Sequence, residues 1–104
     1  MTMENRGNNV IHVIPPTSIL FMNMRLRSFF SKETRLYNAT TKLHFEANIS
    51  YVGDITRISR RDLAKKLGPY YRKYLKEIEN ELAQVGIFLE ARAPWWERPC
   101  DYYD

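Results

Sequence analysis

Residues 58–68 read ISRRDLAKKLG, and this stretch decides which fold we expect for the C-terminal half of the chain. Ser59 is a good N-terminal cap for a helix, and Asp62 follows three residues later, where the acid of a capping box is found. Leu63 and Leu67 are four residues apart, so they lie on one helical face. The final glycine is followed by a proline, which predicts that the helix ends there.

A second, longer helix should begin near Pro69, because proline suits the first turn of a helix. Its buried face is predicted by apolar side chains three or four residues apart, which are Tyr71, Tyr74, Leu75, Ile78, Leu82 and Val85. Gly86 is well placed to end this helix, and residues 87–89 read as a short strand.

These two segments resemble the helix-turn-helix core of winged-helix DNA-binding domains, over residues 58–89. In that family a capped helix of the form S/T-x-x-x-L-A-x-x-L-G is followed by a tight turn and by a recognition helix that ends in a glycine. The first part of the pattern is matched in register by Ser59, Leu63, Ala64, Leu67 and Gly68. The resemblance implies DNA binding, with the early turns of the second helix in a groove, and a possible homodimer.

The charge of the chain is concentrated around the same helices. Residues 57–76 hold eight basic side chains and one acidic one, a local net charge of +7, whereas the whole chain carries +4. A concentrated field of one sign attracts a polyanion, although such a run can also be only a solvated helix face. The candidate nucleic-acid-binding residues are Arg57, Arg60, Arg61, Lys65, Lys66, Tyr70, Arg72, Lys73 and Lys76.

Two of these residues have more specific expected roles. Arg72 is the best candidate for reading a base edge, because its guanidinium can pair with guanine in a bidentate way. Tyr70 could instead stack on an unpaired base, which would favour single strands or RNA over duplex DNA. DNA is preferred because of the helix-turn-helix resemblance.

The N-terminal half reads as β-structure. Residues 10–14 are a β-branched run closed by two prolines, which is typical of an edge strand. Residues 19–30 fit two patterns, since their apolar side chains alternate and also form a helical stripe; we expect a strand, and a helix is the alternative. From Tyr37 to Tyr51, apolar or small side chains at odd positions alternate with polar ones, which predicts a half-buried strand or hairpin.

We therefore expect one small α+β domain at residues 10–93. It would have an N-terminal antiparallel β-sheet of about three strands, then two C-terminal helices in a helix-turn-helix-like arrangement and a short final strand. Residues 1–9 predict a flexible tail, and residues 94–104 an aromatic, acidic one. The aromatic side chains of this second tail either fold back over the sheet or bind another protein; they are Trp95, Trp96, Tyr102 and Tyr103.

Catalysis has little support in the sequence. His12 and His44 are far apart, and no third group at metal-ligand spacing accompanies them. The single Cys100 has no neighbouring histidine and cannot form an internal disulfide. No apolar stretch approaches the roughly 20 residues of a membrane-spanning helix, and the polar start does not read as a signal peptide. We expect a cytoplasmic protein with no enzyme activity, metal or cofactor and no membrane association.

Two functions fit these observations. The favoured one is a small regulatory protein that binds nucleic acid, DNA more readily than RNA, through its basic helix-turn-helix-like surface. The alternative is a small phage- or plasmid-type interaction protein that binds and inhibits or modulates a host protein or a nucleoprotein complex. In that case the basic helices would dock on an acidic protein surface.

Overall fold

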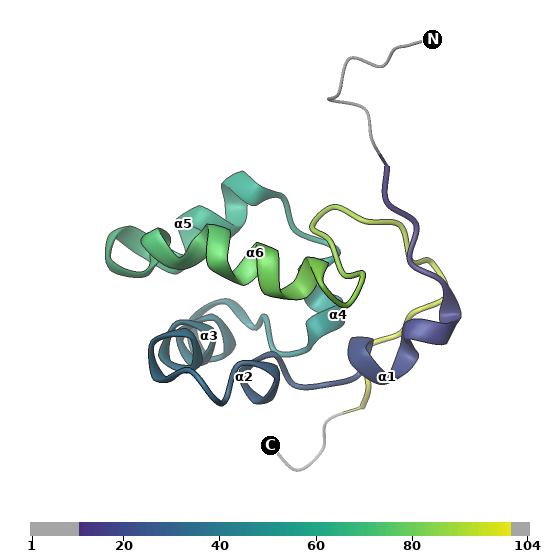
Figure 1. Ribbon diagram of the computed structural model, residues 1–104, viewed down its shortest axis with the longest axis horizontal. Helices are drawn as coiled ribbons and strands as arrows, with labels where there is room; N and C mark the ends of the chain where they lie inside the picture. Colours follow the sequence, from purple (N-terminus) through teal and green to yellow (C-terminus); the bar gives the residue numbers. More distant parts are fainter. Residues whose placement is uncertain (1–10, 101–104) are drawn as a thin grey trace, which may run out of the picture.

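The computed structural model describes residues 11–100, and this part of the chain is helical (Figure 1). Residues 11–100 contain no β-strand, only isolated bridges that join Val13 to Arg92 and Arg25 to Tyr51. The elements, in chain order, are η2 Pro16–Ser18, α1 Ile19–Met22, α2 Leu26–Phe29, α3 Thr34–Ala47, α4 Val52–Ile55, α5 Arg60–Tyr71, η3 Arg72–Tyr74 and α6 Leu75–Ala83.

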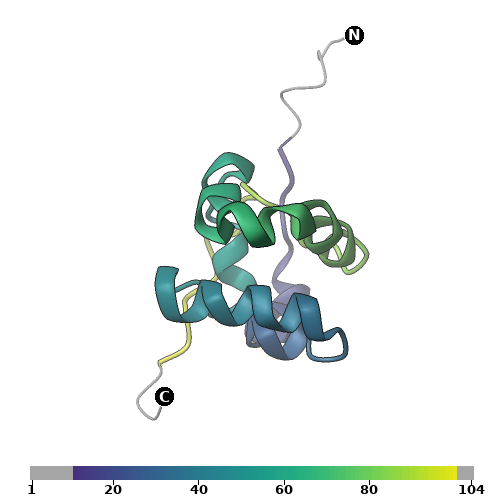
Figure 2. The same cartoon turned by 90° about the vertical axis from the view of Figure 1, so that its left-hand side faces the viewer.

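The helices lie in two layers. Both cartoon views place α5 and α6 in an upper layer, α2 and α3 in a lower one, and α4 between them (Figure 1, Figure 2). Helix α3 packs against α2 within its layer and against α5 across the layers. The buried side chains of both layers form one hydrophobic core. The basic helix α5 is therefore held by a continuous core beneath it.

The predicted N-terminal sheet is wrong, because residues 37–51 lie mostly in α3. The buried side chains of this helix are Leu36, Ala39, Thr40 and Leu43, which have helical spacing. The alternation was misleading because it placed Phe45 on the apolar face, whereas Phe45 is 72% exposed. Thr40, at a polar position of the alternation, is buried and donates its hydroxyl to the Leu36 carbonyl over 2.9 Å.

The other expected strands are also absent from residues 11–100. For residues 19–30 the helical alternative was correct, although the segment forms two short helices: Met22 of α1, Leu26 of α2 and Phe30, which follows α2, are buried and lie four residues apart. In the segment expected as an edge strand, the Ile14 amide donates to the Arg92 carbonyl over 2.9 Å, and the ladder extends no further than the single bridge. The short final strand at 87–89 is likewise not formed.

Two C-terminal helices are present, and the predicted start of the first, break at Gly68 and end of the second are found; however, α5 continues past the break to Tyr71, and α6 begins at Leu75 after η3 and not near Pro69. The Asp62 amide donates to the Ser59 hydroxyl over 3.0 Å, which caps α5. Gly68 interrupts the helical backbone with φ of 80°, a left-handed conformation that suits glycine. Gly86 has the same φ and its amide bonds the Ala83 carbonyl, while the next amide, of Ile87, reaches back to Leu82. This pair of bonds is a Schellman motif, which ends the helix.

Residues 94–100 pack into the fold. Trp96 is 2% exposed, and its indole nitrogen donates to the Asn23 side chain over 2.8 Å. The ring lies on Gly53, where a Cβ atom would come within 2.4 Å of two ring carbons. Trp95 donates its indole N–H to the Ile14 carbonyl over 2.7 Å. The C-terminal segment is thus fixed to α4 and to the start of the described chain.

Candidate nucleic-acid interface

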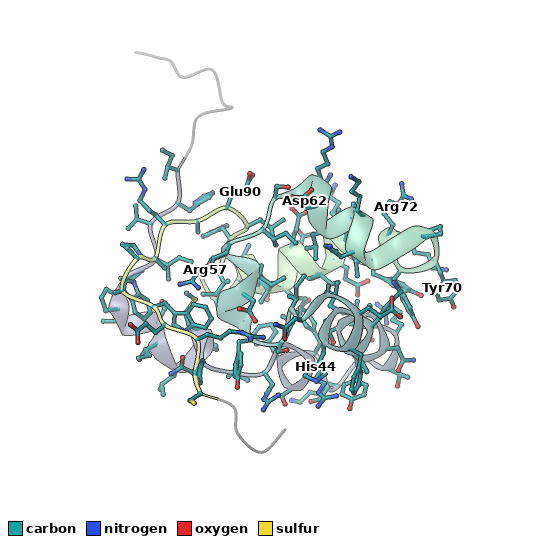
Figure 3. All side chains as sticks on the ribbon, turned by 180° about the vertical axis from the view of Figure 1, so that it is seen from behind. His44, Arg57, Asp62, Tyr70, Arg72 and Glu90 are labelled. Atoms are coloured by element: carbon teal, nitrogen blue, oxygen red, sulfur yellow. The ribbon has the colours of Figure 1, made fainter. Side chains whose placement is uncertain are left out.

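The predicted binding residues are distributed along α5, η3 and the first turn of α6, except Arg57, which lies between α4 and α5. Figure 3 shows Arg72 and Asp62 along one outer edge of the molecule and Tyr70 at its end, whereas Arg57 lies inward from that edge, beside the C-terminal segment. Arg57 donates to the Trp96 carbonyl over 2.6 Å, and its guanidinium lies 4.7 Å from the Trp96 ring centroid. The structure therefore separates Arg57 from the other candidates.

Arg60 is also occupied within the fold. Its Nε atom lies 2.9 Å from Oε1 of Glu79 on α6, so the pair joins the two helices of the upper layer. Lys73 has a different contact, because its ammonium lies 4.7 Å from the Tyr70 ring centroid and 5.4 Å from that of Tyr74. This cation–π contact leaves the charge of Lys73 uncancelled.

The remaining basic candidates have no acidic partner in the part of the chain that the structure describes. Among residues 11–100, no carboxylate lies within the 4.0 Å ion-pair distance of any of them, and all are exposed. We call the set the basic surface; with Lys73 it consists of Arg61, Lys65, Lys66, Arg72, Lys73 and Lys76. The one acidic side chain along its length is Asp62, so the surface carries six positive charges against one negative charge.

Two of the three acidic residues of α6, Glu77 and Glu79, are paired with arginines outside the basic surface, and the third, Glu81, is exposed. Glu77 accepts a hydrogen bond from Arg35 of α3, which also bonds Glu33. The hydrogen bond to Glu33, with the charges of Glu33 and Glu77, raises the pKa of Arg35 above its ordinary value. Glu79 is paired with Arg60, as described above. The negative charges of Glu77 and Glu79 are thus neutralised by cations outside the basic surface.

The turn between the two helices presents Tyr70 and Arg72 to solvent. Leu63 and Leu67 are fully buried on one side of the kink, and Leu75 is buried on the other, so both arms are anchored in the core. The intervening chain turns outward at Gly68 and leaves Tyr70 64% exposed. An exposed tyrosine beside free cations suits contact with a nucleic-acid strand.

Sequence reasoning missed Lys42, which supports this turn. Its ammonium lies 3.1 Å from the Lys66 carbonyl and 2.9 Å from Oε1 of Glu46. A cation at the carbonyl end of a helix interacts favourably with the helix dipole. The spacing of Lys42 and Glu46 is a helical i,i+4 signal, which the strand interpretation of residues 37–51 concealed.

The other candidates are placed as follows. Within the described residues no three His, Cys, Asp or Glu side chains gather in a way that could hold a metal ion. His12 stacks on Phe88, and His44 shares a hydrogen bond with Ser50. Trp95 and Trp96 make the internal contacts given above, whereas Tyr102 and Tyr103 lie outside the described residues.

Comparisons with known proteins identify no relative of this chain. No family model, curated protein or solved structure matches this chain.

None of the helices in residues 11–100 has both the length and the apolar character that crossing a bilayer requires.

Proposed function

We propose that this protein binds nucleic acid through the basic surface of α5, η3 and the start of α6. Duplex DNA is the preferred partner over RNA, because residues 58–89 resemble a helix-turn-helix. A regulatory role follows from that resemblance by analogy.

The proposal rests on one observation: within residues 11–100, the side chains of the basic surface have no acidic partner. Charges that a fold needs are paired, as Arg60 is with Glu79. Six unpaired cations cost stability through mutual repulsion unless a partner neutralises them. A phosphate backbone does so and gains the entropy of released counterions.

The residues of the surface have different expected roles. Arg61, Lys65 and Lys66 lie on the exposed side of α5 and would neutralise phosphates without reading sequence. Arg72 stands at the outward turn, where a guanidinium can reach a base edge. Tyr70 offers an exposed ring to a base or a sugar.

Fluorescence anisotropy with random duplex DNA, single-stranded DNA and RNA, at roughly 50 and 200 mM salt, tests this proposal. The expected result is binding at the lower salt that weakens steeply at the higher one, with duplex DNA bound most tightly. The double variant R72E/K73E should lose this binding. Its matched control is K32E/R92E, which removes the same charge from exposed residues outside the basic surface. Equal losses in the two variants would contradict a localised interface.

A second candidate function is protein binding, which a different observation favours. Several apolar side chains near the start of the described chain are exposed, with Leu20 at 82% and Val13 at 68%. Isolated apolar exposure is common, but a group of such residues marks many interaction sites. A partner held by these side chains would be released by L20K and would be indifferent to R72E/K73E.

A further inference from the structure

A pocket of about 260 Å³ lies between α6 and residues 87–89. Its walls include the fully buried Leu82 and Ile87 and the half-buried ring of Phe88. Phe88 is stacked on His12, with ring centroids 3.8 Å apart and planes inclined by 11°. The stacking holds the Phe88 ring in a defined orientation at the pocket.

The pocket also has polar lining side chains, on the side of α6 that adjoins the basic surface. Lys76 belongs both to the basic surface and to the pocket lining. Asn80, one turn further along α6, is exposed and lines the same pocket with its amide, as does the Arg60–Glu79 pair. A ligand in the pocket therefore has apolar contacts, a hydrogen-bonding amide and a free ammonium around it.

The volume and the lining residues of the pocket fit a ligand with a single ring system. Pockets for whole small molecules usually measure about 300–1,000 Å³, so this pocket suits a single ring system. A nucleobase has an apolar face for Phe88 and a polar edge for Asn80, and its phosphate would lie near Lys76. A base paired within a duplex is not available for such a contact, because it must first leave the stack.

We propose that this pocket receives one unpaired nucleobase of a nucleic acid whose phosphates lie along the basic surface. This inference rests on the proposed function and adds a preference to it. A duplex with an unpaired base at an overhang or bulge should bind more tightly than the same duplex fully paired.

The test compares three duplexes of one sequence by fluorescence anisotropy: fully paired, with a one-nucleotide overhang, and with the same overhang lacking its base. The abasic overhang has the added phosphate without the ring, so it separates charge from base binding. The overhang with its base should bind at least about fivefold more tightly than the other two, as expected for one stacked base. Equal affinity for the two overhangs would overturn the pocket inference, whereas no binding to any duplex would overturn the proposed function itself.

A pair of variants locates the effect in the pocket. A83F places a phenyl ring at a lining position on α6, and Q84F places it on the neighbouring exposed residue, which does not line the pocket. With circular dichroism confirming the fold of both, A83F should abolish the overhang preference and leave fully paired DNA bound as before, whereas Q84F should change neither. A preference retained in A83F would contradict the assignment.

A free nucleotide could also supply the nucleobase that enters the pocket. A nucleoside monophosphate titrated alone should bind far more weakly than the overhang duplex, because it lacks contacts with the basic surface. Equally tight binding, lost in A83F, would assign the pocket to free nucleotides and overturn the proposal.

Discussion

The C-terminal segment and the basic surface both contain arginines, but the fold uses them in opposite ways. Arg98 donates to Asp54 over 3.1 Å and to the Asn48 carbonyl over 3.0 Å, so it ties the C-terminal segment to α4 and to the end of α3. Arg61 and Arg72, on the basic surface, are exposed and have no acidic partner in residues 11–100.

This difference shows which charges are structural and which are available for a partner. A guanidinium that is hydrogen-bonded within the fold contributes to stability, because its removal takes a donor from each of its acceptors. A solvated guanidinium contributes little to stability, but its electric field extends into solvent and attracts an opposite charge. The predictions below separate the two kinds of residue.

The largest effect is expected from removing the ring that holds the C-terminal segment. Trp96→Ala deletes a buried indole and its hydrogen bond to Asn23, so the free energy of unfolding should fall by about 3–5 kcal/mol. Urea denaturation followed by circular dichroism measures this loss. A loss below about 1 kcal/mol would show that the segment is not part of the folded core.

A smaller loss is expected at Asp54, where one carboxylate oxygen serves three donors. It accepts from the amides of Ser50 and Tyr51 over 3.0 and 2.9 Å, and from Arg98. Asp54→Ala should therefore lower the free energy of unfolding by about 1–3 kcal/mol in the same assay.

The control for Asp54→Ala is Asp62→Ala, which removes an exposed acid from the basic surface. It should cost less than about 1 kcal/mol, the usual value of an acid in the first turn of a helix. It should also tighten binding to DNA, because it removes the negative charge among the six positive ones. Weaker binding in this variant would contradict the electrostatic account.

The smallest effects on stability are expected from replacing single arginines, one in the C-terminal segment and one on the basic surface. Arg98→Ala should cost about 1 kcal/mol, since its side chain is one-third exposed, and should leave DNA affinity unchanged. Arg61→Ala should alter stability by less than about 0.5 kcal/mol and should reduce the slope of log affinity against log salt by about one. The two roles would be wrongly assigned if Arg98→Ala changed the salt slope and Arg61→Ala did not.

The parts of the fold that could be predicted have local signals. Ser59 caps its own helix, and Gly68 and Gly86 adopt left-handed conformations that few other residues accept. Their effects act over a few residues, so the start of α5, the break at Gly68 and the end of α6 could be identified from the sequence, whereas the start of α6 at Leu75 could not. The charge of the basic surface was equally visible, since it is a property of composition.

The parts that were missed depend on distant contacts. Residues 37–51 satisfy a two-residue period, and the choice between strand and helix was decided by burial of Leu36 and Leu43 against other helices. Which basic residues stay free depends on tertiary pairs such as Arg60 with Glu79. The packing of Trp96 on Gly53 likewise has no local signal in an acidic, proline-containing segment.

The most direct test of the central claim is the salt dependence of binding to duplex DNA, measured by anisotropy between roughly 50 and 200 mM salt. If the six cations of the basic surface each contact a phosphate, the slope of log affinity against log salt should be about −5. A slope near zero, or no measurable binding at the lower salt, would contradict the account, because the basic surface would then not bind a phosphate backbone.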